Sequence, residues 1–174
     1  MFVNRMTLIQ KEMKPLIVLL VVFSISLLVM KMLYGNFEFA LSGRIAMSAT
    51  LVFTAVAHFV FTKGMAMMLP EFIPYKTRIV YLTGIIEIAA AIGLFIPNLR
   101  VLTAWLLIVF FILILPANIY ASIKHVDYQK ATFDGNGLAY LWFRIPLQIF
   151  FIVWIYLCSI KGYQEEQLIK TQNC

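Results

Sequence analysis

The chain has 174 residues, of which 63% are hydrophobic and 13% charged, with a net charge of +6 and a mean hydropathy of +0.92. Soluble domains carry about a quarter of their residues as charges, so this composition excludes an ordinary soluble domain and predicts a lipid bilayer environment. The basic residues do not form runs or alternate with aromatic residues, so we expect no nucleic-acid partner. Their placement is typical of the charges that flank membrane segments.

Five apolar stretches are long enough to cross a bilayer, which takes about 20 residues of helix. They cover residues 15–34, 44–62, 79–97, 101–122 and 139–160. No connection between them has the length of a soluble domain. The sequence therefore predicts an all-α integral membrane bundle, a single domain over residues 1–174, with five transmembrane helices.

The first stretch is almost featureless, with Val, Leu, Ile and Phe between Leu16 and Met30. Basic residues precede it, as in a secretion signal, but no small-x-small cleavage pattern follows closely. We interpret it as an uncleaved helix at the periphery, which packs against the other helices or anchors the chain in the membrane.

The second stretch runs to His58, and an apolar connection with two prolines, Pro70 and Pro74, follows it. Proline fixes its own backbone and biases the preceding residue away from helix. The connection is too apolar for a solvated loop, so we place it along the membrane surface. It is either a lid over a neighbouring cavity or an interfacial anchor.

The third stretch carries Glu87, nine residues beyond Arg78 and hence about 13 Å along a helix. A carboxylate at that depth does not reach the membrane surface easily. Gly84, Glu87 and Ala91 share one helix face through their three- and four-residue spacing.

The fourth and fifth stretches each carry polar residues near one end. Pro116 frees the carbonyl one turn back, and the Asn118 amide can satisfy that carbonyl or a ligand. Arg144 and Gln148 stand one turn apart on the same face of the fifth stretch.

Alternating crossings place five isolated polar residues at the same side of the membrane. Such side chains are costly in lipid unless they are paired or face a cavity. We expect Glu87 to pair with Arg144, with His58 as a third member that can change charge near neutral pH. The network is then either a structural ion pair or part of a ligand or proton site. The five residues are His58, Glu87, Asn118, Arg144 and Gln148.

Metal and haem chemistry have little support in the sequence. The only histidines are His58 and His125, and Cys158 and Cys174 form no CxxC pair. We therefore expect no metal, haem or dithiol centre in this chain.

A set of short motifs resembles the DoxX-like (DoxX/DoxD) family of small membrane proteins over about residues 45–156. Their order and spacing, more than any single motif, carry the resemblance. They are His58-Phe59, Leu69-Pro70-x-x-x-Pro74, Tyr81-Leu-Thr-Gly84-x-x-Glu87, Pro97-x-x-Arg100, Leu115-Pro-Ala-Asn118-Ile and Arg144-x-Pro146-x-Gln148.

The resemblance implies a four-helix core over residues 41–160, with an added N-terminal helix at 1–40 and a polar tail at 161–174. The family is named after a subunit of a thiosulfate:quinone oxidoreductase, which makes quinone the candidate cofactor or ligand. A related branch is associated with receptor assembly, so a non-enzymatic scaffold is the alternative.

The leading hypothesis is a site for a small apolar ligand, serving quinone-linked redox chemistry. Glu87 and His58 would handle protons as the catalytic pair. The oxygen atoms of the ligand would be oriented by Asn118, Arg144 and Gln148. The connection that contains Pro70 and Pro74 would close the site. Proton-coupled transport is disfavoured because five helices show no evident inverted repeat.

The basic residues also predict the orientation. Nine of the fourteen Lys and Arg fall on the side of the N-terminus, which favours a cytoplasmic N-terminus in a bacterial inner membrane. Besides lipid, the expected partners are another membrane protein or a second copy of the chain. The nine are Arg5, Lys11, Lys14, Lys63, Lys76, Arg78, Lys124, Lys130 and Arg144.

Overall fold

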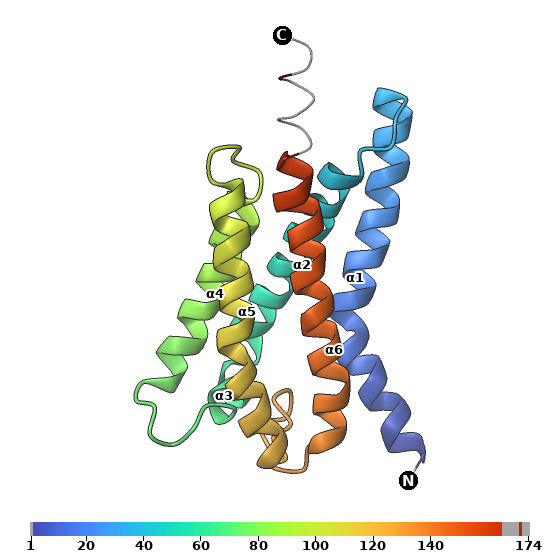
Figure 1. The fold of residues 1–174 in the computed structure, drawn as a ribbon. Helices are drawn as coiled ribbons and strands as arrows, with labels where there is room; N and C mark the ends of the chain where they lie inside the picture. Colours follow the sequence, from blue (N-terminus) through green and yellow to red (C-terminus); the bar gives the residue numbers. More distant parts are fainter. Residues whose placement is uncertain (1, 165–170, 172–174) are drawn as a thin grey trace.

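The computed structural model of the chain describes residues 2–164 and 171, with side chains from Met13 onward. It confirms the predicted all-α bundle. The elements are α1 (Phe2–Tyr34), α2 (Phe39–Val60), α3 (Thr62–Met67), α4 (Lys76–Gly93), α5 (Arg100–Ile123), α6 (Leu138–Ile155) and the π-helical turn η1 (Tyr156–Lys161). Figure 1 shows the long helices running up and down in alternation.

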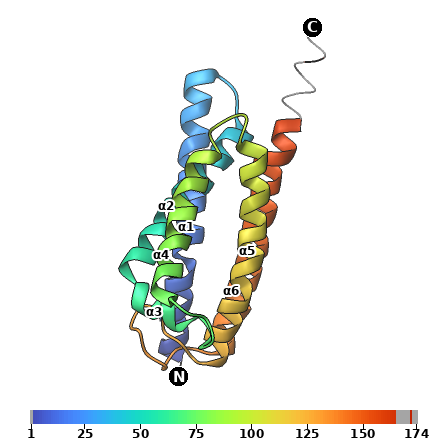
Figure 2. The same ribbon diagram turned by 90° about the vertical axis from the view of Figure 1, so that its left-hand side faces the viewer.

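The long helices form two layers. In Figure 2, α1, α2 and α4 lie on one side and α5 and α6 on the other. Packing agrees with this view, because α2 contacts α1 and α4 most extensively and α5 contacts α6. The space between the layers is therefore where side chains from both halves of the chain meet.

Small residues bring α4 close to α2. A Cβ added at Gly84 would lie 3.0 Å from the Cβ of His58, so the two backbones approach closely there. About two turns further along α4, the Ser48 hydroxyl donates to the Ala91 carbonyl at 3.0 Å. Gly84, Glu87 and Ala91 are all buried, which confirms that they share the inward face of α4.

The layers are joined at the upper end in Figure 1, where α2 begins and η1 ends. The indole N–H of Trp154 donates to the Gly43 carbonyl at 3.1 Å. Arg44, only 4% exposed, donates to the Cys158 carbonyl at 3.5 Å. These contacts hold α6 and η1 against the start of α2.

Four helices are long and apolar enough to span a membrane: Met13–Tyr34, Phe39–Val60, Arg100–Ile123 and Leu138–Gln164. The predicted fifth span, α4, is outside this group, since its 18 residues include Lys76, Arg78 and Glu87. However, α2 and α5 both run downward in Figure 1, and α4 carries the chain back between them. Its crossing of the membrane stays a prediction.

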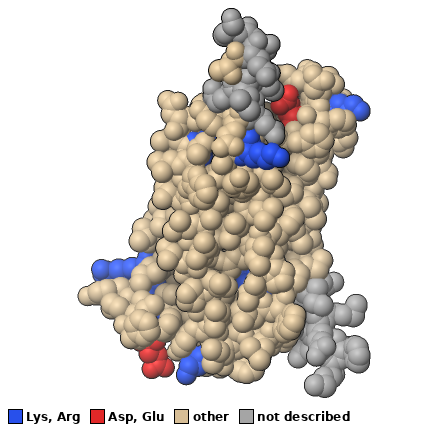
Figure 3. Space-filling view, in the orientation of Figure 1, with Lys and Arg blue, Asp and Glu red and all other residues tan. Residues whose placement is uncertain are grey.

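Charged side chains gather at the two ends of the face drawn in Figure 3, and the broad middle is largely uncharged. An uncharged belt of this kind suits the hydrocarbon core of a bilayer. Together with the apolar helices, it identifies a helical membrane protein whose environment is lipid.

The structure differs from the predicted elements at two places. The first helix begins at Phe2 rather than near residue 15, with Pro15 inside it. The apolar connection after α2 contains a short helix, α3, before its two prolines. Periodicity over six residues is too short to predict a helix of this length.

Candidate functional site

A cavity of about 220 Å³ lies between the two layers, toward the end where α4 and α6 begin. Its lining comes from both layers and is mostly apolar. The five polar residues that the crossings predicted to converge all lie on its wall: His58, Glu87, Asn118, Arg144 and Gln148. Their assigned roles stay predictions, but their convergence is a feature of the fold.

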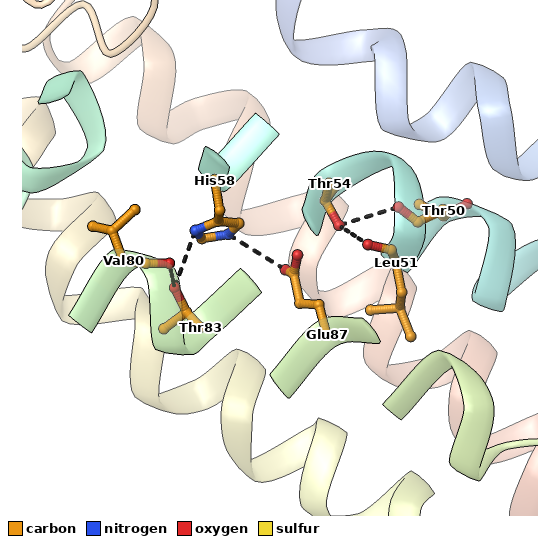
Figure 4. Close-up of polar contacts among 7 residues, drawn as sticks. All are labelled: Thr50, Leu51, Thr54, His58, Val80, Thr83 and Glu87. Carbon is orange, nitrogen blue, oxygen red and sulfur yellow. Dashed lines mark hydrogen bonds and ion pairs between the residues drawn. The ribbon is translucent and has the colours of Figure 1, made fainter. Parts of the chain in front are cut away.

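The α2–α4 wall carries a chain of polar contacts through His58. Its Nε2 atom lies 3.6 Å from Oε1 of Glu87, and its Nδ1 atom lies 3.0 Å from the Thr83 hydroxyl. Figure 4 shows the imidazole ring between the two α4 side chains. Sequence reasoning missed Thr83, although its position one turn before Glu87 on α4 was a usable signal.

The hydrogen bonds of the Thr83 hydroxyl determine whether Nδ1 of His58 carries a proton. This hydroxyl also lies 2.8 Å from the Val80 carbonyl, which can only accept. A hydroxyl has one proton, so both bonds form together only if His58 Nδ1 donates to Thr83. The Nε2 atom is then the ring nitrogen that faces Glu87.

We expect Thr83→Val to change the tautomer of the neutral His58 ring, because Nδ1 loses its acceptor. Thr83→Ser should keep the wild-type tautomer. The measurement is ¹⁵N NMR of protein labelled at histidine, at a pH where the ring is neutral. The chain has two histidines, so His125→Gln assigns the signals. An unchanged His58 signal in Thr83→Val would contradict the assignment of the Nδ1 proton.

The α5–α6 wall faces this pair with amide and guanidinium groups. The side-chain amide of Gln148 donates from Nε2 to the Phe111 carbonyl. The Tyr140 hydroxyl donates to Oδ1 of Asn118 at 3.0 Å. Arg144 lies on the cavity wall between these two contacts along α6.

The expected direct ion pair between Glu87 and Arg144 is wrong. Among the described residues, the ionic partner of Glu87 is His58, from the same layer. The cavity separates the two walls, so the carboxylate and the guanidinium face the same space without pairing. Spacing along the sequence gave the depth of both side chains but not the distance between the layers.

Within the described part of the chain, three polar atoms on the walls of this cavity are buried without a hydrogen-bond partner: Glu87 Oε2, Gln148 Oε1 and Asn118 Nδ2. Each such group costs about 1–3 kcal/mol when it is left unpaired. A bound molecule or water in the cavity would supply the missing hydrogen bonds to these atoms.

Two segments close the cavity at its lower end. Met65, Met68 and Leu69 line it from α3 and the residues that follow, and Tyr128 and Gln129 line it from the α5–α6 connection. The predicted two-proline connection thus borders the cavity with its first residues. Pro70 and Pro74 are not among the lining residues, and Pro74 is exposed.

The first helix takes part in the site, contrary to its interpretation as a peripheral helix. Lys14 and Pro15 of α1 line the cavity. An amphipathic pattern could not reveal this contact, since the stretch is apolar on every side. Among the described residues, no group of three His, Cys, Asp or Glu side chains could hold a metal ion.

The comparisons with known proteins give one family match. No curated protein and no solved structure shows significant similarity to the chain. A family match covers residues 47–159, from within α2 to within η1, and includes all five polar residues of the cavity wall. The chain belongs to the family described as Domain of unknown function (DUF8561).

Proposed function

We propose that the cavity binds a small, largely apolar molecule that carries polar oxygen atoms. The observation that supports this is the set of three buried, unpartnered polar atoms on otherwise apolar walls. Ligand sites commonly combine an apolar lining with a few convergent polar groups. Here the apolar part includes Met47, Leu51, Phe111, Leu147 and Phe151.

A quinone head group is the ligand class that we favour. Its flat apolar ring would lie between the layers, and donor groups of Asn118 and Arg144 would orient its oxygen atoms. Reduction of a quinone takes up two electrons and two protons. In this proposal the Glu87–His58 pair exchanges protons with the ligand, and a partner membrane subunit supplies or accepts the electrons.

The DoxX-like resemblance fits this proposal, which makes the chain a candidate quinone-linked oxidoreductase subunit. We place it in a bacterial inner membrane with a cytoplasmic N-terminus, by the distribution of Lys and Arg. In that orientation the end of the bundle that holds the cavity faces the cytoplasm. The α3 segment and the α5–α6 connection would close over the bound ligand.

The test is to identify molecules that remain bound after gentle purification. Wild-type protein and Ala117→Phe are extracted with organic solvent, and quinone-class molecules are counted per protein by mass spectrometry. Ala117 lines the cavity, so a phenyl ring there should reduce bound quinone at least about tenfold. The matched control is Ala89→Phe, at an exposed position of α4 outside the cavity lining.

Two results would contradict the proposal. One is wild-type protein free of any quinone-class molecule, and free of binding when such a molecule is added. The other is equal quinone content in Ala117→Phe and Ala89→Phe, which would place the molecule elsewhere on the bundle.

A second candidate is a non-enzymatic membrane scaffold or assembly factor. It is favoured by the way the polar contacts join helices: His58 to α4, and Gln148 and Tyr140 to α5. Such contacts fix helix register whether or not a ligand binds. In that case Glu87→Leu would change thermal stability or partner recovery, while Ala117→Phe would displace no small molecule.

A further inference from the structure

Two of the three unpartnered polar atoms on the cavity wall are hydrogen-bond acceptors, and the third, Asn118 Nδ2, is a donor. Gln148 is 7% exposed, and its orientation is fixed because the Phe111 carbonyl can bond only to the NH₂ end of the amide. Its Oε1 atom therefore remains as the unpartnered acceptor. Glu87 is 4% exposed; its Oε1 atom lies 3.6 Å from His58 Nε2, and its Oε2 atom, which has no hydrogen-bond partner among the described residues, is an acceptor in the carboxylate form.

The two acceptors lie at comparable depth on opposite walls. Both α4 and α6 begin at the lower end in Figure 1, at Lys76 and Leu138. Glu87 and Gln148 lie about 16 Å and about 15 Å along these helices, at 1.5 Å per residue. The two acceptors therefore border the cavity from opposite layers at a similar height.

The protein does not supply a donor for Glu87 from the neighbouring hydroxyl. Thr54 lies beside Glu87 in Figure 4, and its hydroxyl is 3.0 Å from the Leu51 carbonyl and 3.1 Å from the Thr50 carbonyl. Its single proton is used within α2. A donor to Glu87 Oε2 can therefore come from water or from a molecule that fills the cavity.

The charges on the wall favour a neutral donor over a cation. Lys14 lines the same cavity as Glu87, whose carboxylate already has His58 as a partner. A ligand ammonium would add to this positive charge in a region of low dielectric. A hydroxyl group donates a hydrogen bond without any charge.

Building on the proposed function, we propose that the cavity is selective for the reduced, hydroxyl-bearing form of its ligand, a quinol, over the oxidised quinone. A quinol has two O–H donors on opposite sides of the ring, which match Gln148 Oε1 and Glu87 Oε2. A quinone has only carbonyl oxygens, which would face these acceptors without a proton between them. Sites built to bond a ligand hydroxyl discriminate strongly against analogues that lack it.

Selectivity of this kind changes the redox behaviour of the bound ligand. Tighter binding of the reduced form raises the midpoint potential of the bound couple. For a two-electron couple, a tenfold preference corresponds to about 30 mV. The site would thereby stabilise the bound ligand as the quinol, the form that carries the two protons.

The experiment compares three probes with the same ring and a decyl chain: the dimethoxybenzoquinone, its quinol and the dimethyl ether of that quinol. Their dissociation constants are measured by titration of purified protein in detergent, with the quinol kept reduced under anaerobic conditions. We expect the wild-type protein to bind the quinol at least about tenfold more tightly than the other two.

The variants Gln148→Met and Glu87→Leu should each reduce this preference to less than about threefold, because each removes one acceptor. Glu71→Leu, at an exposed position outside the cavity lining, is the matched control and should keep the preference. Because two variants are measured, the prediction can still be tested if one of them does not fold.

The outcomes separate the two proposals. Equal binding of quinol and quinone by the wild-type protein would overturn the selectivity and leave quinone binding intact. Equal binding of the quinol and its dimethyl ether would also overturn it, since the ether has no donor. Failure of all three probes to bind would overturn the proposed function itself.

Discussion

Replacing Gly64 with alanine is expected to detach the two segments that close the lower end of the cavity. A Cβ added at Gly64 would lie 1.8 Å from the carbonyl oxygen of Tyr128 and 2.5 Å from its carbonyl carbon. These are backbone atoms, so no side-chain rotation relieves the clash. Overpacking of this kind costs about 1–3 kcal/mol, and here it acts where α3 meets the α5–α6 connection.

The measurement is hydrogen–deuterium exchange over residues 124–137, together with thermal unfolding in detergent. We expect faster exchange in Gly64→Ala and a lower unfolding midpoint, and Phe61 should lose its ring contact with Tyr128, whose centroids lie 6.1 Å apart. Lys63→Ala, at the exposed neighbouring position, is the control. Unchanged exchange over 124–137 in Gly64→Ala would show that this contact does not hold the connection in place.

The sequence predicted the long helices well because length and apolar content determine them locally. The boundaries of α5 and α6 fall within a few residues of the predicted 101–122 and 139–160. The grouping into two layers depends on long-range packing that no local pattern records. Gly64 is an example, since its close partner, Tyr128, is 64 residues away.

The candidate site was predicted in part for a similar reason. Depth along a helix follows from residue counts, so Glu87, Asn118 and Gln148 were placed at the correct end of the bundle. The partner of Glu87 depends on the rotation and separation of the helices, and a hydropathy pattern does not determine either of them. That is why Arg144 was predicted to pair with Glu87 and His58 does so instead.

A second stability effect is expected at the opposite end, from Gly43→Ala. A Cβ at this position would lie 2.2 Å from Sγ and 2.9 Å from Cβ of Cys158, in the π-helical turn η1. The Gly43 carbonyl also accepts the indole N–H of Trp154. The added methyl would therefore push apart the two layers where they are joined, and we expect a loss of about 1–3 kcal/mol.

A size exchange tests this mechanism directly. Cys158→Gly removes both atoms that clash, so Gly43→Ala with Cys158→Gly should be more stable than the sum of the single changes predicts, with a coupling free energy of about 0.5–3 kcal/mol. Cys158→Ala should rescue less, because it keeps the Cβ that would lie at 2.9 Å. Val153→Ala, at an exposed site on α6, should not rescue at all.

Additive effects of Gly43→Ala and Cys158→Gly on the unfolding midpoint would show that this contact does not hold the layers together. Because Gly43 does not line the cavity, the rescued double variant should bind the quinol probe as the wild-type protein does.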